Sequence, residues 1–222
     1  MSVDITPINL GISNCYLLNT GGGFVLVDTG AASRRAQLEA ALAAAGCQPG
    51  NLALILLTHG DFDHSANAEY LRDRYGAPVA LHADDVGMIM SQDMRWGRKP
   101  TPDRFLLFFR IISILAPVAA PKPFQVDHSF RDEFDLAPFG LTAEIIPLPG
   151  HSKGSVGVLT EERDLICGDL LMSVFRPQLH FLIDDMAAAR ASIESLKGRD
   201  VRTVYPGHGR PFPMIQYLAR YL

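Results

Sequence analysis

The sequence predicts a layered α/β fold in which helices lie outside two β-sheets. One observation behind this is that short apolar β-type runs alternate with helical segments over the first hundred residues, and the alternation returns after residue 141. A second is that candidate metal ligands recur where predicted strands end, which is where α/β folds gather their active sites. With 222 residues, 48% of them hydrophobic, the chain suits a single domain over residues 1–222.

The first half predicts a β-hairpin followed by alternating helices and strands. Gly21-Gly22-Gly23 separates two β-type runs and marks the hairpin turn. Ser33 is the expected N-cap of an alanine-rich helix that ends near Gly46. A continuous apolar run, such as 52–57, is typical of a strand buried on both faces. The predicted strands are 15–18, 24–27, 52–57 and 78–81, and a second helix is predicted at 65–75.

The second half has the same organisation. A charged turn at 161–164 separates two of its β-type runs, and residues 186–196 have the composition of a helix. No sequence repeat is strong enough to establish an internal duplication. The predicted strands are 141–146, 156–159, 165–167 and 201–205.

Residues 94–124 interrupt this pattern and are predicted to be an insertion lying over the core. They carry six basic residues against one acid, a local charge of +5 that leaves −9 on the rest of the chain. Within them, residues 105–120 are apolar around most of a helical circumference, so such a helix must be mostly buried. Core packing or a homodimer interface is the favoured role. A hydrophobic lid over an acyl or aromatic substrate, or basic flanks on an anionic membrane surface, are the alternatives.

Composition excludes several classes of function. A net charge of −4 argues against a nucleic-acid-binding protein, which normally has a basic face. Three scattered cysteines are too few for a disulfide framework. The first residues show no export signal, and the longest apolar run is shorter than the roughly 20 residues of a transmembrane helix. We therefore expect a cytoplasmic protein without a transmembrane segment.

Four candidate metal ligands occur within six residues after the predicted strand 52–57. They are His59, Asp61, Asp63 and His64. The alternate positions 59, 61 and 63 can converge on one side of an extended turn. Imidazole and carboxylate groups are ligands for zinc, iron and manganese. A loop without a metal rarely concentrates them so closely.

Three further candidates, His151, Asp169 and His208, each follow a predicted strand and come directly after a glycine. The glycine lets the backbone turn sharply and bring the side chain close to the other loops. The sequence therefore predicts that all four loops meet at one edge of the sheets.

Five segments resemble, in order, the motifs of the metallo-β-lactamase superfamily. They are Val27-Asp28-Thr29-Gly30, Thr58 to His64, Pro149-Gly150-His151, Gly168-Asp169 and Pro206-Gly207-His208-Gly209. The resemblance spans residues 27–209 and implies an αββα four-layer sandwich with a two-metal site. It also implies a ligand set: His59, Asp61 and His151 on the first metal, Asp63, His64 and His208 on the second, and Asp169 bridging both. Asp28 would support the metal loops from a buried position.

The first loop departs from the family's common pattern. The family has His-x-His-x-Asp-His, whereas this chain has an H-x-D-x-D-H variant with Asp61 in place of the second histidine. A carboxylate there favours iron or manganese relative to zinc. We expect two divalent metal ions, with zinc as the first candidate and iron or manganese as the others. The flavodiiron branch similarly has a carboxylate at this place.

The resemblance implies a hydrolase in which a metal-bridging hydroxide attacks a small-molecule substrate. Asp63 is the candidate to orient the nucleophile and accept its proton. His180 is a candidate to contact substrate, and a partly exposed loop histidine is the equal alternative. The apolar insertion favours a small ester, lactone or thioester. The alternatives are a non-haem diiron redox protein with a separate electron donor and a non-catalytic metal-binding sensor.

Overall fold

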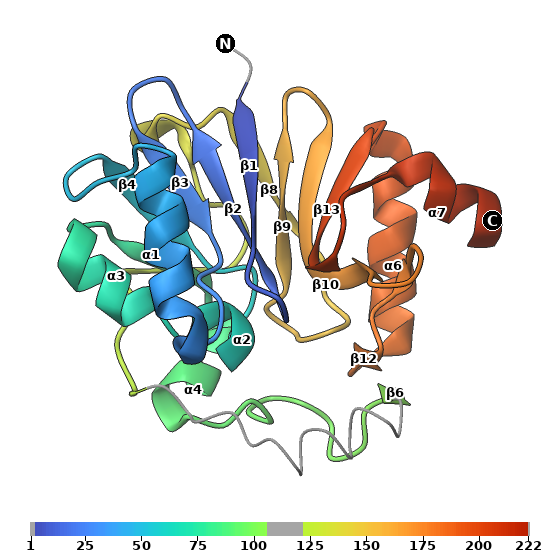
Figure 1. Cartoon of the computed structure of the whole chain (residues 1–222). Coiled ribbons are helices and arrows are strands. Elements are labelled where there is room, and N and C mark those ends of the chain that lie inside the picture. Colours follow the sequence, from blue (N-terminus) through green and yellow to red (C-terminus); the bar gives the residue numbers. More distant parts are fainter. Residues whose placement is uncertain (1–2, 106–121, 222) are drawn as a thin grey trace.

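The structure, a computed structural model, describes residues 3–105 and 122–221. Two β-sheets stack face to face, and helices cover their outer faces, which gives the four layers of an αββα sandwich (Figure 1). Helices α1 (Arg35–Ala44) and α3 (Ala68–Tyr75) lie outside the first sheet, and α6 (Met186–Leu196) and α7 (Met214–Tyr221) outside the second. The predicted fold class is confirmed.

The first sheet has the strand order β1-β2-β3-β4-β5-β7. β1, β2 and β3 are antiparallel, so the predicted hairpin is present, and β3, β4, β5 and β7 are parallel. β1 was not predicted because its residues are mostly exposed and show no regular apolar alternation. The strands are β1 (Asp4–Asn9), β2 (Asn14–Asn19), β3 (Phe24–Val27), β4 (Leu52–Leu56), β5 (Val79–His82) and β7 (His128–Phe130).

The second sheet has the order β14-β13-β10-β9-β8, and β11 pairs with β10. β10 and β13 are parallel, with an irregular register around Gly168, and the β8–β9 and β9–β10 pairs are antiparallel. The strands are β8 (Ala143–Pro147), β9 (Val156–Thr160), β10 (Asp164–Ser173), β11 (Gln178–Leu179), β13 (Thr203–Gly209) and β14 (Phe212–Pro213).

Apolar side chains fill the space between the sheets and beneath the outer helices. β4 contributes to both sides of its sheet: Leu54 and Leu56 face the second sheet, whereas Ile55 packs among the residues under α1 and α3. This two-sided burial is the reason that residues 52–57 form a continuous apolar run. The two sheets are also joined by polar contacts, since the Tyr16 hydroxyl donates to the Pro206 carbonyl at 2.6 Å.

Several helix boundaries differ from the sequence prediction. Ser33 does not cap α1: it lies in a short 3-10 helix (Ala32–Arg34), and the N-cap position is Arg34, without a side-chain cap. The helix predicted at 65–75 is two helices, α2 (Phe62–Ser65) and α3, and α4 (Ala83–Ser91) and α7 were not predicted. Two further 3-10 helices are Ala137–Phe139 and Lys197–Arg199.

The start of the predicted insertion is docked against the second half of the chain. β6 (Arg104–Phe105) pairs with β12 (Leu182–Ile183), and the Lys99 backbone N–H donates to Asp184 at 2.8 Å. Residues 106–121 lie outside the described residues, so the buried helix and homodimer interface predicted there stay predictions. Within 3–105 and 122–221 no helix is long and apolar enough to cross a membrane.

Candidate metal centre

The structure brings all seven predicted ligands together at one edge of the sandwich, and His180 joins them. Most of these side chains are buried; Asp63, whose side chain is 24% exposed, is the most accessible. Their nitrogen and oxygen atoms form sets of three that lie within 4.8 Å of one another. The sets are His59 with Asp61 and His151, His59 with His64 and Asp169, Asp63 with His64 and His208, and His151 with Asp169 and His180.

Hydrogen bonds at Nδ1 hold the rings of the predicted histidine ligands. His64 Nδ1 lies 2.9 Å from Asp28 Oδ2, and His151 Nδ1 and His208 Nδ1 lie 2.9 and 2.7 Å from backbone carbonyls. His59 Nδ1 lies 2.9 Å from the Thr58 hydroxyl, which itself donates to Asp28. Each Nδ1 therefore has a partner that can accept its proton, which leaves Nε2 as the atom that can present a lone pair to a metal ion.

The Nε2 atoms point at carboxylates and at each other. His64 Nε2 and His208 Nε2 are 3.4 Å apart, and they lie 3.4 and 3.1 Å from oxygens of Asp169. His59 Nε2 and Asp169 Oδ1 are buried and have no hydrogen-bond partner among the described residues. Lone pairs and carboxylates gathered in a buried place require positive charge between them. The donor set therefore fits metal ions held by imidazole and carboxylate groups.

The same crowding shifts the pKa values of the histidines. Burial lowers the pKa of His59 well below its ordinary value. Burial alone would also lower the pKa of His64, but Asp169, Asp63 and Asp28 raise it well above its ordinary value. For His208, Asp169 likewise outweighs burial and raises the pKa to about 8. The second ligand set therefore attracts positive charge strongly.

Two of the candidate ligands lie within strands, whereas the sequence had predicted that they would follow strands. β10 continues past Asp169 to Ser173, and β13 includes His208. Gly168, at φ +50°, breaks the register of β10 so that Asp169 reaches the site while pairing resumes beyond it. A Cβ at Gly207 would overlap Asp169 Oδ1, so only glycine lets β13 approach this closely.

Asp28 supports the loops of the candidate ligands from a buried position. Its carboxylate accepts hydrogen bonds from the Thr58 backbone N–H at 2.8 Å and from the Thr58 hydroxyl, besides its contact with His64 Nδ1. Through these contacts it orients His64 directly and His59 through Thr58. Such outer partners of ligating histidines tune both ring orientation and basicity.

Asp85, in the unpredicted helix α4, is a supporting residue that the sequence did not reveal. Its side chain accepts hydrogen bonds from Gly60 N at 3.1 Å, Gly154 N at 2.9 Å and the Ser152 hydroxyl at 2.6 Å. Gly60 belongs to the loop of His59, and Ser152 and Gly154 to the loop of His151. Asp85 thus ties two ligand loops together. Only its acidic character at the start of a helix could have drawn attention to it.

Arg98, from the predicted insertion, also reaches the cluster. Its guanidinium Nη2 lies 3.0 and 3.1 Å from the two oxygens of Asp61 and 3.1 Å from His151 Nε2. The sequence indicated a basic segment here but gave no sign that this arginine enters the site. The Arg98 charge is the main influence that holds the pKa of Asp61 far below its usual range against the effect of burial.

The structure also gives clear places to His180, Cys167 and His82. His180 is buried, unlike the partly exposed loop histidine that was its alternative, and its Nε2 lies 3.3 Å from Asp169 Oδ2. Burial lowers the pKa of His180 to about 3. Cys167 is a buried thiol packed in the apolar cluster of the second sheet. His82 caps α4 by accepting from the Asp84 backbone N–H.

Known proteins with similar sequences and structures identify the family of this chain. A sequence profile of the metallo-beta-lactamase superfamily matches residues 8–208. The chain is 30% identical to the uncharacterized protein ML0493 of Mycobacterium leprae, over 91% of this chain and 89% of the relative. It is 28% identical to the probable metallo-hydrolase MJ0888 of Methanocaldococcus jannaschii, over 89% and 87%. The structure of TTHA1623 in a di-iron-bound form superposes with a TM-score of 0.72, at 28% identity and 96% coverage of both chains. The chain therefore belongs to the metallo-beta-lactamase superfamily.

Proposed function

We propose that the protein is a dinuclear metal-dependent hydrolase. His59, Asp61 and His151 would hold the first metal, Asp63, His64 and His208 the second, and Asp169 would bridge them. The observation that carries this proposal is the convergence of four Nε2 lone pairs on buried carboxylates, with every Nδ1 held by a separate partner. Zinc, manganese and iron all suit these donors.

Two divalent ions bound there would supply a water of lowered pKa and polarise the substrate oxygen. Asp63 is the residue that we propose as catalytic besides its role as a ligand. It lies in the first turn of α2 with its side chain 24% exposed, and its Oδ2 lies 3.5 Å from His208 Nε2 and 3.7 Å from His64 Nε2. From that place its free oxygen can orient a water and accept the proton that the water loses.

We propose a small ester, lactone or thioester as substrate. The support for this class is the apolar sequence of 105–120, which suits an acyl or aromatic substrate. The test is hydrolysis of chromogenic esters, lactones and thioesters beside a phosphodiester. We expect chelator to abolish turnover, added metal to restore it, and Asp63→Asn to lower kcat by about 10²- to 10⁴-fold. Preferential cleavage of the phosphodiester would overturn the substrate class.

His180, whose Nε2 lies 3.3 Å from Asp169 Oδ2, supports the same proposal. Its Nδ1 lies 3.2 Å from the Leu182 carbonyl and 3.3 Å from the Leu182 N–H, so either tautomer has a local partner. Its Nε2 can thus donate to a substrate oxygen or act as a ligand beside His151 and Asp169. His180→Gln separates the two: a raised KM with unchanged metal content indicates substrate contact, and lost metal indicates a ligand.

A diiron redox protein with a separate electron donor is the second candidate. Asp61 favours it because a carboxylate is a harder ligand than histidine, and TTHA1623, which is similar in structure, has been crystallised in a di-iron-bound form. Elemental analysis of protein purified without added metal, followed by oxygen consumption with a reductant, tests it. Two irons with oxygen uptake and no hydrolysis would replace the hydrolase. Metal binding without either activity would indicate a sensor.

A further inference from the structure

Arg98 places a buried positive charge inside the first ligand set. Its side chain is 7% exposed, and Nη2 is within 3.1 Å of both Asp61 oxygens and of His151 Nε2. The segment that carries it is held in place by Trp96, whose ring lies against Gly87 of α4, and by Lys99, whose backbone N–H donates to Asp184. The guanidinium is therefore a built part of the site and not a surface charge that happens to lie near it.

The contact uses the lone pair that a metal ion would need. His151 Nδ1 faces the Leu182 carbonyl at 2.9 Å and carries the ring proton, so Nε2 has a single lone pair. An arginine nitrogen can only donate, and Nη2 is placed to donate to that lone pair. One lone pair cannot serve both the N–H of Arg98 and a metal ion. A metal on His151 and Asp61 must therefore displace Nη2.

The second ligand set has no arginine or lysine contact among the described residues. Within residues 3–105 and 122–221, the hydrogen bonds and ion pairs of the His64 and His208 side chains involve only histidine, aspartate and backbone groups. The carboxylates also raise the affinity of this set for positive charge. The resident arginine is thus a difference between the two sets that bears directly on loading.

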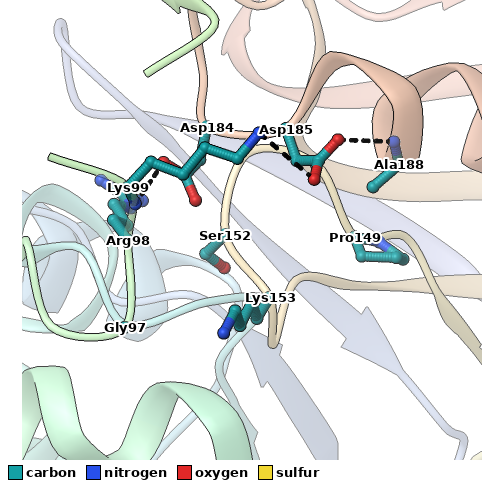
Figure 2. Close-up of a pocket in the computed structure, with 10 residues that line it drawn as sticks. Gly97, Arg98, Lys99, Pro149, Ser152, Lys153, Asp184, Asp185 and Ala188 are labelled. Atoms are coloured by element: carbon teal, nitrogen blue, oxygen red, sulfur yellow. Dashed lines mark hydrogen bonds and ion pairs between the residues drawn. The ribbon is translucent and has the colours of Figure 1, made fainter. Parts of the chain in front are cut away.

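A displaced Arg98 has a place to go. The arginine lines a cavity of about 330 Å³ that also includes Lys99, Ser152, Lys153 and Asp184. Figure 2 shows Arg98 beside Lys99 and Asp184 at one end of this cavity. Arg98 Nε is buried without a hydrogen-bond partner among the described residues, so its present position leaves one donor unused. In the cavity the guanidinium could pair with Asp184, so its charge need not remain unpaired.

We propose that Arg98 is a resident cation that competes with the first metal ion for Asp61 and His151. The centre then loads in order: the set of Asp63, His64 and His208 binds first and more tightly, and the set of His59, Asp61 and His151 binds only as Arg98 moves toward Asp184. This inference rests on the proposed two-metal function. It also gives Asp61 a role, because a carboxylate can pair with arginine as well as with a metal.

The test is calorimetric titration of the metal-free protein with zinc alone, comparing wild type with Arg98→Met and the matched control Arg95→Met. Arg95 is exposed, and its ion pair is with Asp93, outside the site. We expect two binding steps in wild type and in Arg95→Met. In Arg98→Met the weaker step should tighten by about tenfold or more, which corresponds to losing one charge-assisted hydrogen bond. The tighter step should not change.

Two further variants make the result decisive. His151→Ala should remove the weaker step, which identifies it with the first set, and Arg98→Gln gives the same tightening if Arg98→Met does not fold. A weaker step that is unchanged or weakened in both Arg98 variants would overturn the inference, since Arg98 would then support the first metal. If wild type binds two zinc ions in this way, the two-metal proposal survives that outcome. Zinc binding by none of the proteins would overturn both.

Discussion

Asp85 offers a sharp test of how the ligand loops are held, because it contacts both of them without being a predicted ligand. It accepts the backbone N–H groups of Gly60 and Gly154 and the hydroxyl of Ser152. It is fully buried, at 0% exposure. Asp85→Asn keeps the shape of the side chain but replaces one accepting oxygen with a donating amide. Whichever way the amide faces, one of the two backbone N–H groups loses its acceptor.

The expected loss of stability follows from the number of backbone N–H groups that lose their acceptor. A buried donor left without a partner costs about 1–3 kcal/mol, so we expect Asp85→Asn to lower the free energy of unfolding by about that amount. Asp85→Ala removes both acceptors and should cost about 2–6 kcal/mol on the same basis. Burial raises the pKa of Asp85 despite these hydrogen bonds. Removing the charge therefore recovers some desolvation energy, which keeps Asp85→Asn toward the lower end.

Urea unfolding of the metal-free proteins measures the change, with Asp84→Asn as the control. Asp84 is the preceding residue in α4, and its partially exposed carboxylate pairs with the exposed Arg131 at 2.7 Å. An exposed pair contributes about 0–1 kcal/mol, so the control should change little. Zinc affinity should fall about 10- to 100-fold in Asp85→Asn and stay constant in Asp84→Asn. Equal unfolding free energies and zinc affinities in the two variants would refute the assigned role of Asp85.

Three other predictions concern the metal centre itself. Asp28→Asn, which suits the left-handed backbone at this position (φ +61°), removes the charge that orients His64 and should weaken zinc binding by about 10- to 100-fold in calorimetry. Gly207→Ala, whose Cβ would overlap Asp169 Oδ1, should lower bound metal in elemental analysis, whereas Gly198→Ala, with open space around it, should not. When the free metal concentration is 100 times the Kd, adding a chelator should lower the free energy of unfolding by about 2.7 kcal/mol. This corresponds to a fall in Tm of about 5–10 °C. An unchanged Tm after complete metal removal would contradict the two-metal assignment.

The features that the sequence predicts well are those with a local physical signature. The apolar run 52–57 predicts a strand that is buried on both faces, because successive side chains point to opposite faces and all of them are apolar. The structure has β4 there. The candidate ligands His59, His151 and His208 were predicted because histidines near glycines at strand ends form a compact local pattern. Gly168 and Gly207 lie beside candidate ligands because a side chain at either position would overlap neighbouring atoms.

The features that the sequence misses depend on contacts between distant segments. Nothing near Asp85 in the chain indicates that Gly60 and Gly154 lie against it, since those glycines lie 25 and 69 residues away. β1 is mostly exposed, and its pairing with β2, more than its own apolar pattern, specifies it as a strand. The extension of β10 beyond Asp169 depends on β13 and β11 as partners. The local sequence pattern of a strand does not indicate which distant strand it pairs with.

Charge balance connects the unusual Asp61 with the way the centre is built. With its histidines neutral, as metal binding requires, the site gathers the carboxylates of Asp28, Asp61, Asp63 and Asp169 in a place largely closed to water. Such a group is stable only beside a matching amount of positive charge. Two divalent ions supply it fully. One divalent ion in the set of His64 and His208 needs a further cation near Asp61, and Arg98 is the cation that the fold provides there. A histidine at position 61 would remove both the extra negative charge and the partner of the arginine. Asp61→His should therefore leave the Arg98 charge unpaired beside the first metal site and repel the metal ion more strongly than in wild type.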